Sequence, residues 1–362
     1  MDQSDKKYNI SNLEKKFSIS HPYLKGRIDD IKNFLYPKHH LWGVEIFHKI
    51  DDLNSRLLQE FHSQHLDKFD QFISRFIFNG FSNLNRELSF ILKNKKSIVY
   101  SVSGPFSLSL NIKRPKVFTW VFKQPTQPQS LFSPYHPDNL LQHSGFLCLT
   151  PNAENYFSQF APSKFIPWAV DQDFFDGRSP KQEPKIPFFL ATGKTGRDYR
   201  TLINAAYLVD SEIRIIGPSI QKPKNLPSNV IWIDTSSDPP DQAIDYPTLR
   251  EWYAQCTAVC IPLGGDADDT CGYTNLLEAM AMRKPVLMTQ SGCLHINAET
   301  DGFGMQIKPR DIQGWALAMK HLQEDHEKAL ELGKRGREIV ESDFTIERFN
   351  QDVIEFIKYC SN

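Results

Sequence analysis

Short apolar runs alternate with amphipathic stretches through the second half of the chain, and this alternation limits the possible folds more than any other feature. The runs predict strands at residues 188–191, 213–216, 230–233, 258–263 and 286–289. The stretches between and after them predict helices at 198–208, near 248–254, from 274 onward, near 312–322 and near 327–340. Such alternation is typical of a parallel sheet with helices on both faces. Ligands of these sheets bind outside the carboxyl ends of the strands.

The first half has a less regular pattern of the same kind. Strands are predicted at 97–102, 117–122 and 145–149, and residues 52–94 carry helical spacing. Thr150 and Pro151 are typical of an N-cap and a first-turn proline, and they predict a helix to about residue 160.

Residues 171–185 hold a glycine and two prolines among charged side chains, which predicts a linker. We therefore expect an N-terminal domain over residues 1–172, of which 1–25 form a polar arm. A C-terminal domain is expected over 185–343, followed by a terminal helix over 344–362. The total of 362 residues suffices for two domains of ordinary size.

Composition excludes several classes of protein. The 42 basic and 43 acidic side chains nearly cancel, so no global attraction to nucleic acid is expected. No window approaches the length of an apolar membrane span, and residues 1–20 lack the apolar core of a signal peptide. The six cysteines form no CxxC pair, which favours free thiols in a reducing compartment. Cytoplasmic residence is the resulting expectation.

The loop and helix after the strand at 258–263 form the most informative motif. Gly272 precedes a predicted helix with Thr274 as its N-cap, and Glu278 follows one turn later. Open backbone N–H groups at a helix start favour a phosphate, and a carboxylate one turn in could hold a sugar hydroxyl. A structural alternative is an ordinary strand–turn–helix in which Glu278 only stabilises the first turns.

A second loop follows the strand at 188–191. Gly193 and Gly196 allow close approach of the backbone to a ligand, and Lys194 and Arg197 supply cations suited to a diphosphate. The alternative is a solvated turn in which Arg197 pairs only with Asp198. Asp266 and Asp268 form a DxD pattern, but two loop aspartates are more often N-caps or solvated turn residues, so no metal is expected.

Both loops resemble retaining glycosyltransferases of the GT-B fold, the family 4 type (glycosyl transferases group 1). In that family an acidic residue, seven spacers and a glutamate precede a small-residue helix and a Lys-Pro-Val strand, here Glu278 and residues 284–286. The resemblance implies an α/β fold with two Rossmann-like, doubly wound domains facing a central cleft. It also implies that the terminal helix packs back on the N-terminal domain.

The resemblance implies transfer of a sugar from a UDP- or GDP-linked donor with retention of configuration, without a metal or cofactor. Glu278, Arg197 and Lys194 would be the catalytic residues, with Glu278 holding the donor. The implied donor-binding residues are Gly193, Gly196, Asp269, Thr270, Gly272, Tyr273, Thr274, Asn275 and Glu299. Residues facing the acceptor would be His40, Trp42, Gly43, Ser103 and Lys123. The acceptor would be a glycan, a lipid-linked sugar or a small molecule, and peripheral membrane contact is compatible with this function.

Two positions depart from the family pattern. Thr270 stands where the family has its acid, with Asp268 and Asp269 just upstream, and Phe122 lies near the place of a donor-contacting histidine. These departures favour one alternative, a degenerate protein that binds a nucleotide sugar or a partner without catalysis. A second alternative is a sugar-nucleotide epimerase of the same architecture, for which no persuasive pair of catalytic acids is found.

Overall fold

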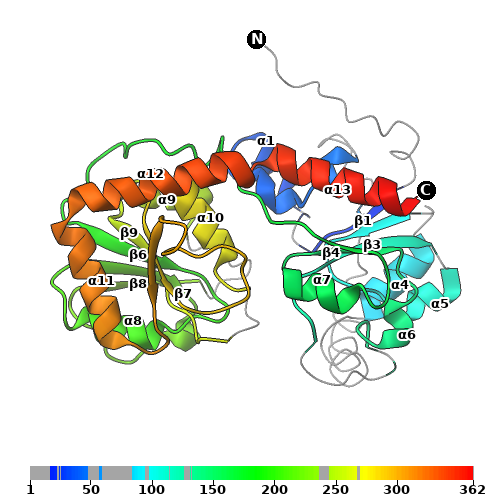
Figure 1. Cartoon of the computed structure of the whole chain (residues 1–362), viewed down its shortest axis with the longest axis horizontal. Helices are drawn as coiled ribbons and strands as arrows, with labels where there is room; N and C mark the ends of the chain where they lie inside the picture. The colour runs from blue at the N-terminus through cyan, green and yellow to red at the C-terminus, as the bar shows by residue number, and fades with distance from the viewer. Residues whose placement is uncertain are drawn as a thin grey trace, which may run out of the picture. The chain divides into compact units, whose positions relative to one another are not determined.

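A computed structural model of the chain describes residues 17–22, 24, 26–47, 57–58, 84–93, 98–113, 115–125, 131, 133–235, 244–266 and 270–361. These residues fall into two compact units (Figure 1). Unit 1 comprises the described residues within Met1–Lys32, His39–Pro167 and Phe349–Asn362. Unit 2 comprises those within Asn33–Lys38 and Trp168–Arg348. Among the described residues, no helix combines the length and the apolar character that a membrane crossing needs.

Unit 1 contains a parallel sheet in the order β1-β2-β3-β4-β5. Its strands are β1 (Phe17–Ser20), β2 (Ile98–Ser101), β3 (Lys116–Val121), β4 (Gly145–Cys148) and β5 (Ser163–Phe165). Both faces of the central strands are apolar because both are covered. Val117 and Val121 pack among the residues of the helices on one face, whereas Trp120 contacts Phe349 on the other face.

Helix α7 of unit 1 (Pro151–Phe157) begins at the capping residues that the sequence predicts. Thr150 accepts a hydrogen bond from the Ala153 N–H (3.2 Å) and so caps α7. The other helical elements are α1 (Ile28–Lys32), η2 (Lys38–Leu41), η3 (Val44–Ile46), α4 (Leu84–Lys93), α5 (Leu108–Lys113), α6 (Pro137–Leu140) and α13 (Ile346–Ser361). From Phe349 onward α13 belongs to unit 1, where Phe349 stacks on Trp120 with ring centroids 5.3 Å apart.

Unit 2 contains a second parallel sheet in the order β11-β10-β9-β6-β7-β8. The strands are β6 (Phe188–Thr192), β7 (Glu212–Gly217), β8 (Val230–Asp234), β9 (Ala258–Ile261), β10 (Val286–Thr289) and β11 (Gly304–Ile307). The strand order reverses between β6 and β9, which pair directly. Such a reversal is the topological switch point at which doubly wound sheets bind their ligands.

Helices cover both faces of this sheet (Figure 1). They are α8 (Tyr199–Ala206), η5 (Ser219–Gln221), α9 (Tyr246–Gln255), α10 (Tyr273–Ala281), α11 (Ile312–Glu324) and α12 (His326–Asp343). The α8 and α11 helices pack together over one face, and α12 packs against α10 over the other. Each central strand is therefore buried on both sides, as its continuous apolar sequence indicates.

The structure differs from the predicted elements in several places. Phe17–Ser20 forms the buried strand β1 inside the predicted polar arm, and β11 was not predicted. The predicted linker is partly packed, since the Asp171 carboxylate is buried and accepts a hydrogen bond from the Lys38 N–H (2.8 Å). Helix α10 begins at Tyr273 with Gly272 as N-cap, so Thr274 is not the cap. Of the helical stretch at 52–94, residues 57–58 and 84–93 are described.

Candidate functional site

The loops that follow β6 and β9 lie side by side at the switch point. Arg197 forms an antiparallel bridge with Leu263, and the Asp198 N–H donates to the Pro262 carbonyl oxygen (3.0 Å). The Asp198 carboxylate accepts from the backbone N–H (3.1 Å) and the hydroxyl (2.6 Å) of Thr201 and so caps α8. The Asp198 carboxylate therefore caps α8, and the predicted alternative in which it pairs with Arg197 is wrong.

Gly193 is required where the first loop leaves β6. Its φ is 130°, and a Cβ at this position would lie 2.4 Å from Nη2 of Arg197. The Gly193 carbonyl oxygen accepts a hydrogen bond from the Tyr199 hydroxyl (2.7 Å), which fixes the turn to the start of α8. Gly196 also has a positive φ, 68°, and is exposed. The two glycines thus shape the loop around the Arg197 side chain.

The Arg197 guanidinium is held by neutral oxygens. It donates to the carbonyl oxygens of Thr192 (3.1 Å) and Thr195 (2.9 Å) and to Oδ1 of Asn275 (2.6 Å). No carboxylate among the described residues forms an ion pair with it. The side chain is therefore fixed in place while its positive charge stays uncompensated, which suits an anionic ligand.

The N-terminus of α10 lies next to this charge. Gly272 caps the helix with a φ of 87°, and no side chain caps this end within the described part of the chain. A Cβ on Gly272 would lie 2.6 Å from Cγ2 of Ile261 and 3.9 Å from Nη1 of Arg197. Uncapped amides at a helix start carry a partial positive charge, so the helix and the guanidinium attract an anion to the same place.

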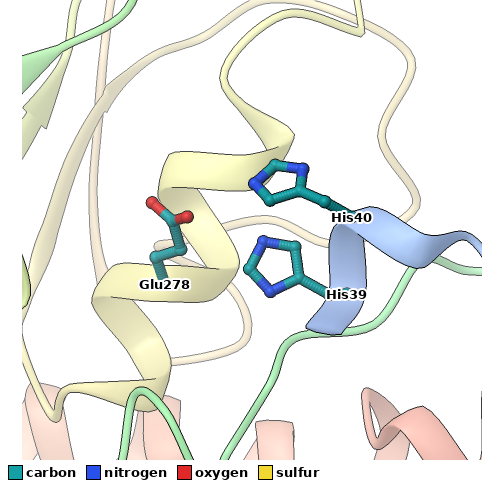
Figure 2. Close-up of side chains that lie close together, drawn as sticks. All are labelled: His39, His40 and Glu278. Atoms are coloured by element: carbon teal, nitrogen blue, oxygen red, sulfur yellow. The ribbon is translucent and has the colours of Figure 1, made fainter. Parts of the chain in front are cut away.

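A chain of hydrogen bonds connects Arg197 to Glu278. Asn275, which accepts from Arg197, donates to the Tyr253 hydroxyl (3.3 Å), and that hydroxyl donates to Oε2 of Glu278 (2.9 Å). Glu278 projects from α10 (Figure 2) and is 1% exposed. Burial, with the Glu278 charge nearby, raises the pKa of Tyr253 well above its ordinary value, so the phenol stays protonated and donates. The two predicted catalytic side chains thus belong to one polar network.

Tyr253 is the residue of this network that the sequence did not indicate. Tyr253 lies on α9, and no sequence motif around it distinguishes it from a tyrosine that only packs in the core. Its hydroxyl joins two residues of α10 that share a helix face, being three positions apart.

The remaining donor-side predictions have different environments. Lys194 is half-buried, and its carbonyl oxygen accepts from Nε2 of Gln221 (3.1 Å). Thr270 and Thr274 are half-buried, whereas Glu299 is exposed in the turn before β11. The buried Tyr273 ring contacts three side chains of unit 2, namely Trp168, His295 and Phe344. Asp269 lies outside the described residues.

Of the predicted acceptor-side residues, Trp42 and Gly43 have packing roles. The Trp42 ring is 8% exposed and lies 5.1 Å from the Trp120 ring, centroid to centroid. The Trp42 carbonyl oxygen accepts from the Tyr100 hydroxyl (2.6 Å). Gly43 has a φ of 78°, and a Cβ there would lie 3.3 Å from Oδ1 of Asn350.

The other three predicted acceptor-side residues, His40, Ser103 and Lys123, carry polar side chains. His40 lies in the short helix η2, and Ser103 and Lys123 each follow the end of a strand. His40 projects from η2 (Figure 2), and burial, followed by the charge of His39, lowers its pKa well below the ordinary value. Its imidazole is therefore neutral near pH 7. The Ser103 hydroxyl accepts from the Ser20 hydroxyl (3.1 Å), and Lys123 is exposed just after β3.

Comparisons with known proteins agree with this architecture. Residues 189–325 match the model of the family described as Glycosyl transferases group 1. No curated protein matches the chain significantly.

Solved structures resemble the whole chain at low sequence identity. A glycosyltransferase from Rickettsia africae is 14% identical with a TM-score of 0.62, over 96% of this chain and 98% of that chain. Sucrose-phosphate synthase from Thermosynechococcus elongatus is 15% identical with a TM-score of 0.59, over 83% and 80%. HepE of Anabaena, solved with UDP and glucose, is 15% identical with a TM-score of 0.59, over 95% and 100%.

The chain therefore has the GT-B fold, which confirms the predicted fold class. Within this fold, the match to the group 1 glycosyltransferase model falls on unit 2.

Proposed function

We propose that this protein is a glycosyltransferase that moves a sugar from a nucleotide diphosphate donor to an acceptor. The observation that carries the proposal is the uncompensated Arg197 guanidinium beside the uncapped start of α10, at the switch point of the sheet. Both groups attract the same diphosphate, and the group 1 family match covers both of them. This arrangement favours a donor site in unit 2.

The chemistry of glycosyl transfer explains why such groups are needed. Breaking the bond between the sugar and the diphosphate leaves negative charge on the departing oxygen. Arg197, Lys194 and the first amides of α10 would stabilise that charge, each well-placed donor being worth roughly 2.7–4 kcal/mol in known enzymes. Glu278 would hold the donor sugar, and its carboxylate is oriented by Tyr253. We also propose that the transfer retains the anomeric configuration of the sugar and needs no metal ion.

The donor is proposed to be a UDP- or GDP-linked sugar. HepE of Anabaena has been solved with UDP and with UDP-glucose, and its fold is shared by this chain. UDP-glucose is therefore the first probe, and a GDP-sugar is the second.

A second candidate function is binding of a nucleotide sugar without turnover. Thr270 stands in place of the acid of the resembling family, and Phe122 lies near the place of its donor-contacting histidine. Calorimetry combined with an assay for transfer or donor hydrolysis separates the two functions, since both require binding and only one requires turnover.

Arg197→Ala should weaken binding of UDP at least about tenfold, because a charge-assisted hydrogen bond is worth roughly 1.5–3 kcal/mol. Titration calorimetry measures this effect directly. Arg200→Ala is the matched control, since Arg200 is exposed on the first turn of α8 and should leave the affinity unchanged. Equal affinity of the wild type and Arg197→Ala, with both proteins folded, would contradict the proposed donor site.

A further inference from the structure

A shallow hollow on unit 1 is lined almost entirely by amide side chains. Its volume is about 310 Å³, and its lining residues are Gln124, Asn152, Asn155, Tyr156 and Gln159. Gln124 comes three residues after the end of β3, and α7 begins three residues after the end of β4. The hollow therefore lies near the carboxyl edge of the unit 1 sheet, where open α/β sheets bind their ligands.

Helical spacing places the lining residues that come from α7 and from the turn after it on one face of the helix. Asn152, Asn155, Tyr156 and Gln159 are separated by three, one and three positions, which places them along a single stripe of α7 and the turn after it. The opposite face carries Ala153 and Phe157, both fully buried in the core. The amide side chains of Asn152, Asn155 and Gln159 are therefore not needed for packing of the helix against the core.

The four amides make no hydrogen bond with other side chains or with the backbone in the described part of the chain. Asn152, Asn155 and Gln159 are exposed, and Gln124 is half-buried. Each amide offers two N–H donors and a carbonyl acceptor. None of the five lining residues is charged at neutral pH. This chemistry matches a ligand with many neutral groups that both donate and accept, and it does not match an anion.

Tyr156 adds an apolar surface to the hollow. Its half-buried ring meets Phe157 edge-on with centroids 5.0 Å apart and lies 5.5 Å from Phe160, so its orientation is fixed by packing. An aromatic ring supplies a flat apolar face together with a polar hydroxyl. A sugar ring matches such a side chain. The C–H groups on one side of the sugar can stack on the aromatic face, and the hydroxyls around the sugar can form hydrogen bonds.

We infer that this hollow binds a neutral glycan. It would hold the hydroxyls of the glycan with Gln124, Asn152, Asn155 and Gln159 and place a sugar ring on Tyr156. Glycan binding here stands on the geometry of unit 1 alone. The further statement that this glycan is the acceptor rests on the proposed function, and it assigns the acceptor to the class of uncharged oligosaccharides.

The test measures binding of three probes to the full chain: maltotriose, N,N′,N″-triacetylchitotriose and a heparin tetrasaccharide. At least one neutral probe should bind. The double variant Asn152→Ala/Asn155→Ala should weaken it roughly tenfold, because two neutral hydrogen bonds are lost. Tyr156→Phe should keep most of the affinity and Tyr156→Ala should lose it. Gln351→Ala removes an exposed amide of α13 outside the hollow and should change nothing.

Binding of UDP-glucose is measured in the same variants and should be unchanged. Glycan binding without binding of either UDP-glucose or the GDP-sugar would sink the proposed function and leave the hollow as a glycan site. The inference itself is overturned when neither neutral probe binds the wild type. It is also overturned when the double variant binds as tightly as Gln351→Ala, or when only the heparin tetrasaccharide binds.

Discussion

Tyr253 joins two side chains of the candidate donor site through a single hydroxyl. The hydroxyl donates to Glu278 and accepts from Asn275, which in turn accepts from Arg197. A buried carboxylate that loses one of its donors is costly, because desolvation of the charge is no longer offset. The orientation of Glu278 therefore depends on a residue that need not contact any substrate.

Tyr253→Phe removes this hydroxyl and keeps the ring. We expect it to lower the free energy of unfolding by about 1–3 kcal/mol, since the buried Glu278 carboxylate loses one of its donors. Sugar transfer should also fall, because Glu278 is less well oriented. Urea denaturation and a turnover assay measure the two effects.

Tyr207→Phe is the control for this substitution, because Tyr207 is 63% exposed at the end of α8. It should leave both quantities unchanged. If Tyr253→Phe behaved like Tyr207→Phe in both assays, the hydrogen-bonded network would have no role in orienting Glu278.

At the scale of elements, the position of α10 is determined by the strand below it. Gly272 starts the helix with a positive φ, and Ile261 at the end of β9 occupies the space that a side chain would need. A residue with a Cβ would suffer both the left-handed backbone and this contact. The close approach brings the helix start next to Arg197.

Gly272→Ala should lower the free energy of unfolding by about 1–3 kcal/mol, the usual cost of a strained backbone position. Gly264→Ala in the same loop is the matched control, because a Cβ there meets nothing within 4 Å. Its effect should stay within about 0.5 kcal/mol. Thermal or urea unfolding of both variants checks the difference, and equal stabilities would show that the Ile261 contact relaxes without cost.

The alternation of apolar runs was sufficient to predict most elements of the sheets. Strands β2, β3, β4, β6 and β10 lie within a residue or so of the predicted runs, because buried parallel strands are apolar on both faces. Strand β1 could not be predicted in this way, since two of its four residues, Ser18 and Ser20, are polar and become buried only in the tertiary structure. Likewise β11 is short and begins with a glycine.

The sequence placed Gly193, Arg197 and Gly272 in two loops at strand ends, and the structure brings these loops together. Their role in donor binding stays a prediction. The N-cap of α10 was predicted wrongly because Thr274 is the better cap by propensity, whereas the tertiary contact with Ile261 selects glycine. Tyr253 was not predictable, because hydrogen bonds between α9 and α10 arise only from tertiary packing.

At the scale of the whole molecule, unit 1 carries two further histidines that, like His40, resist protonation: the buried His143 and the half-buried His21. Burial lowers the pKa of His143 to about 4, and the charge of Arg86 acts in the same direction. The neutral ring of His143 accepts the Phe106 N–H (3.2 Å). Burial also lowers the pKa of His21 to about 4. In the unfolded chain both groups take up protons near their ordinary pKa of about 6.5.

The unfolded state therefore binds more protons than the folded state between about pH 6.5 and pH 4. The stability that these histidines contribute is present above pH 6.5 and is lost as the pH falls through this window. Unfolding midpoints at several pH values should show this decline, and His143→Gln should make it less steep. His326→Gln, an exposed histidine at the start of α12, should keep the wild-type slope. A slope equal in all three proteins would contradict this assignment.

The path of the chain has a consequence for the order in which the protein is assembled. Unit 1 includes the earliest described strand, but it also takes Phe349 and the residues after it from the far end of the sequence. The Phe349 ring stacks on Trp120, and Asn350 donates to Glu45 (2.9 Å). On the ribosome, the strands of unit 1 must therefore wait with an uncovered aromatic surface at Trp120 until Phe349 has been synthesised.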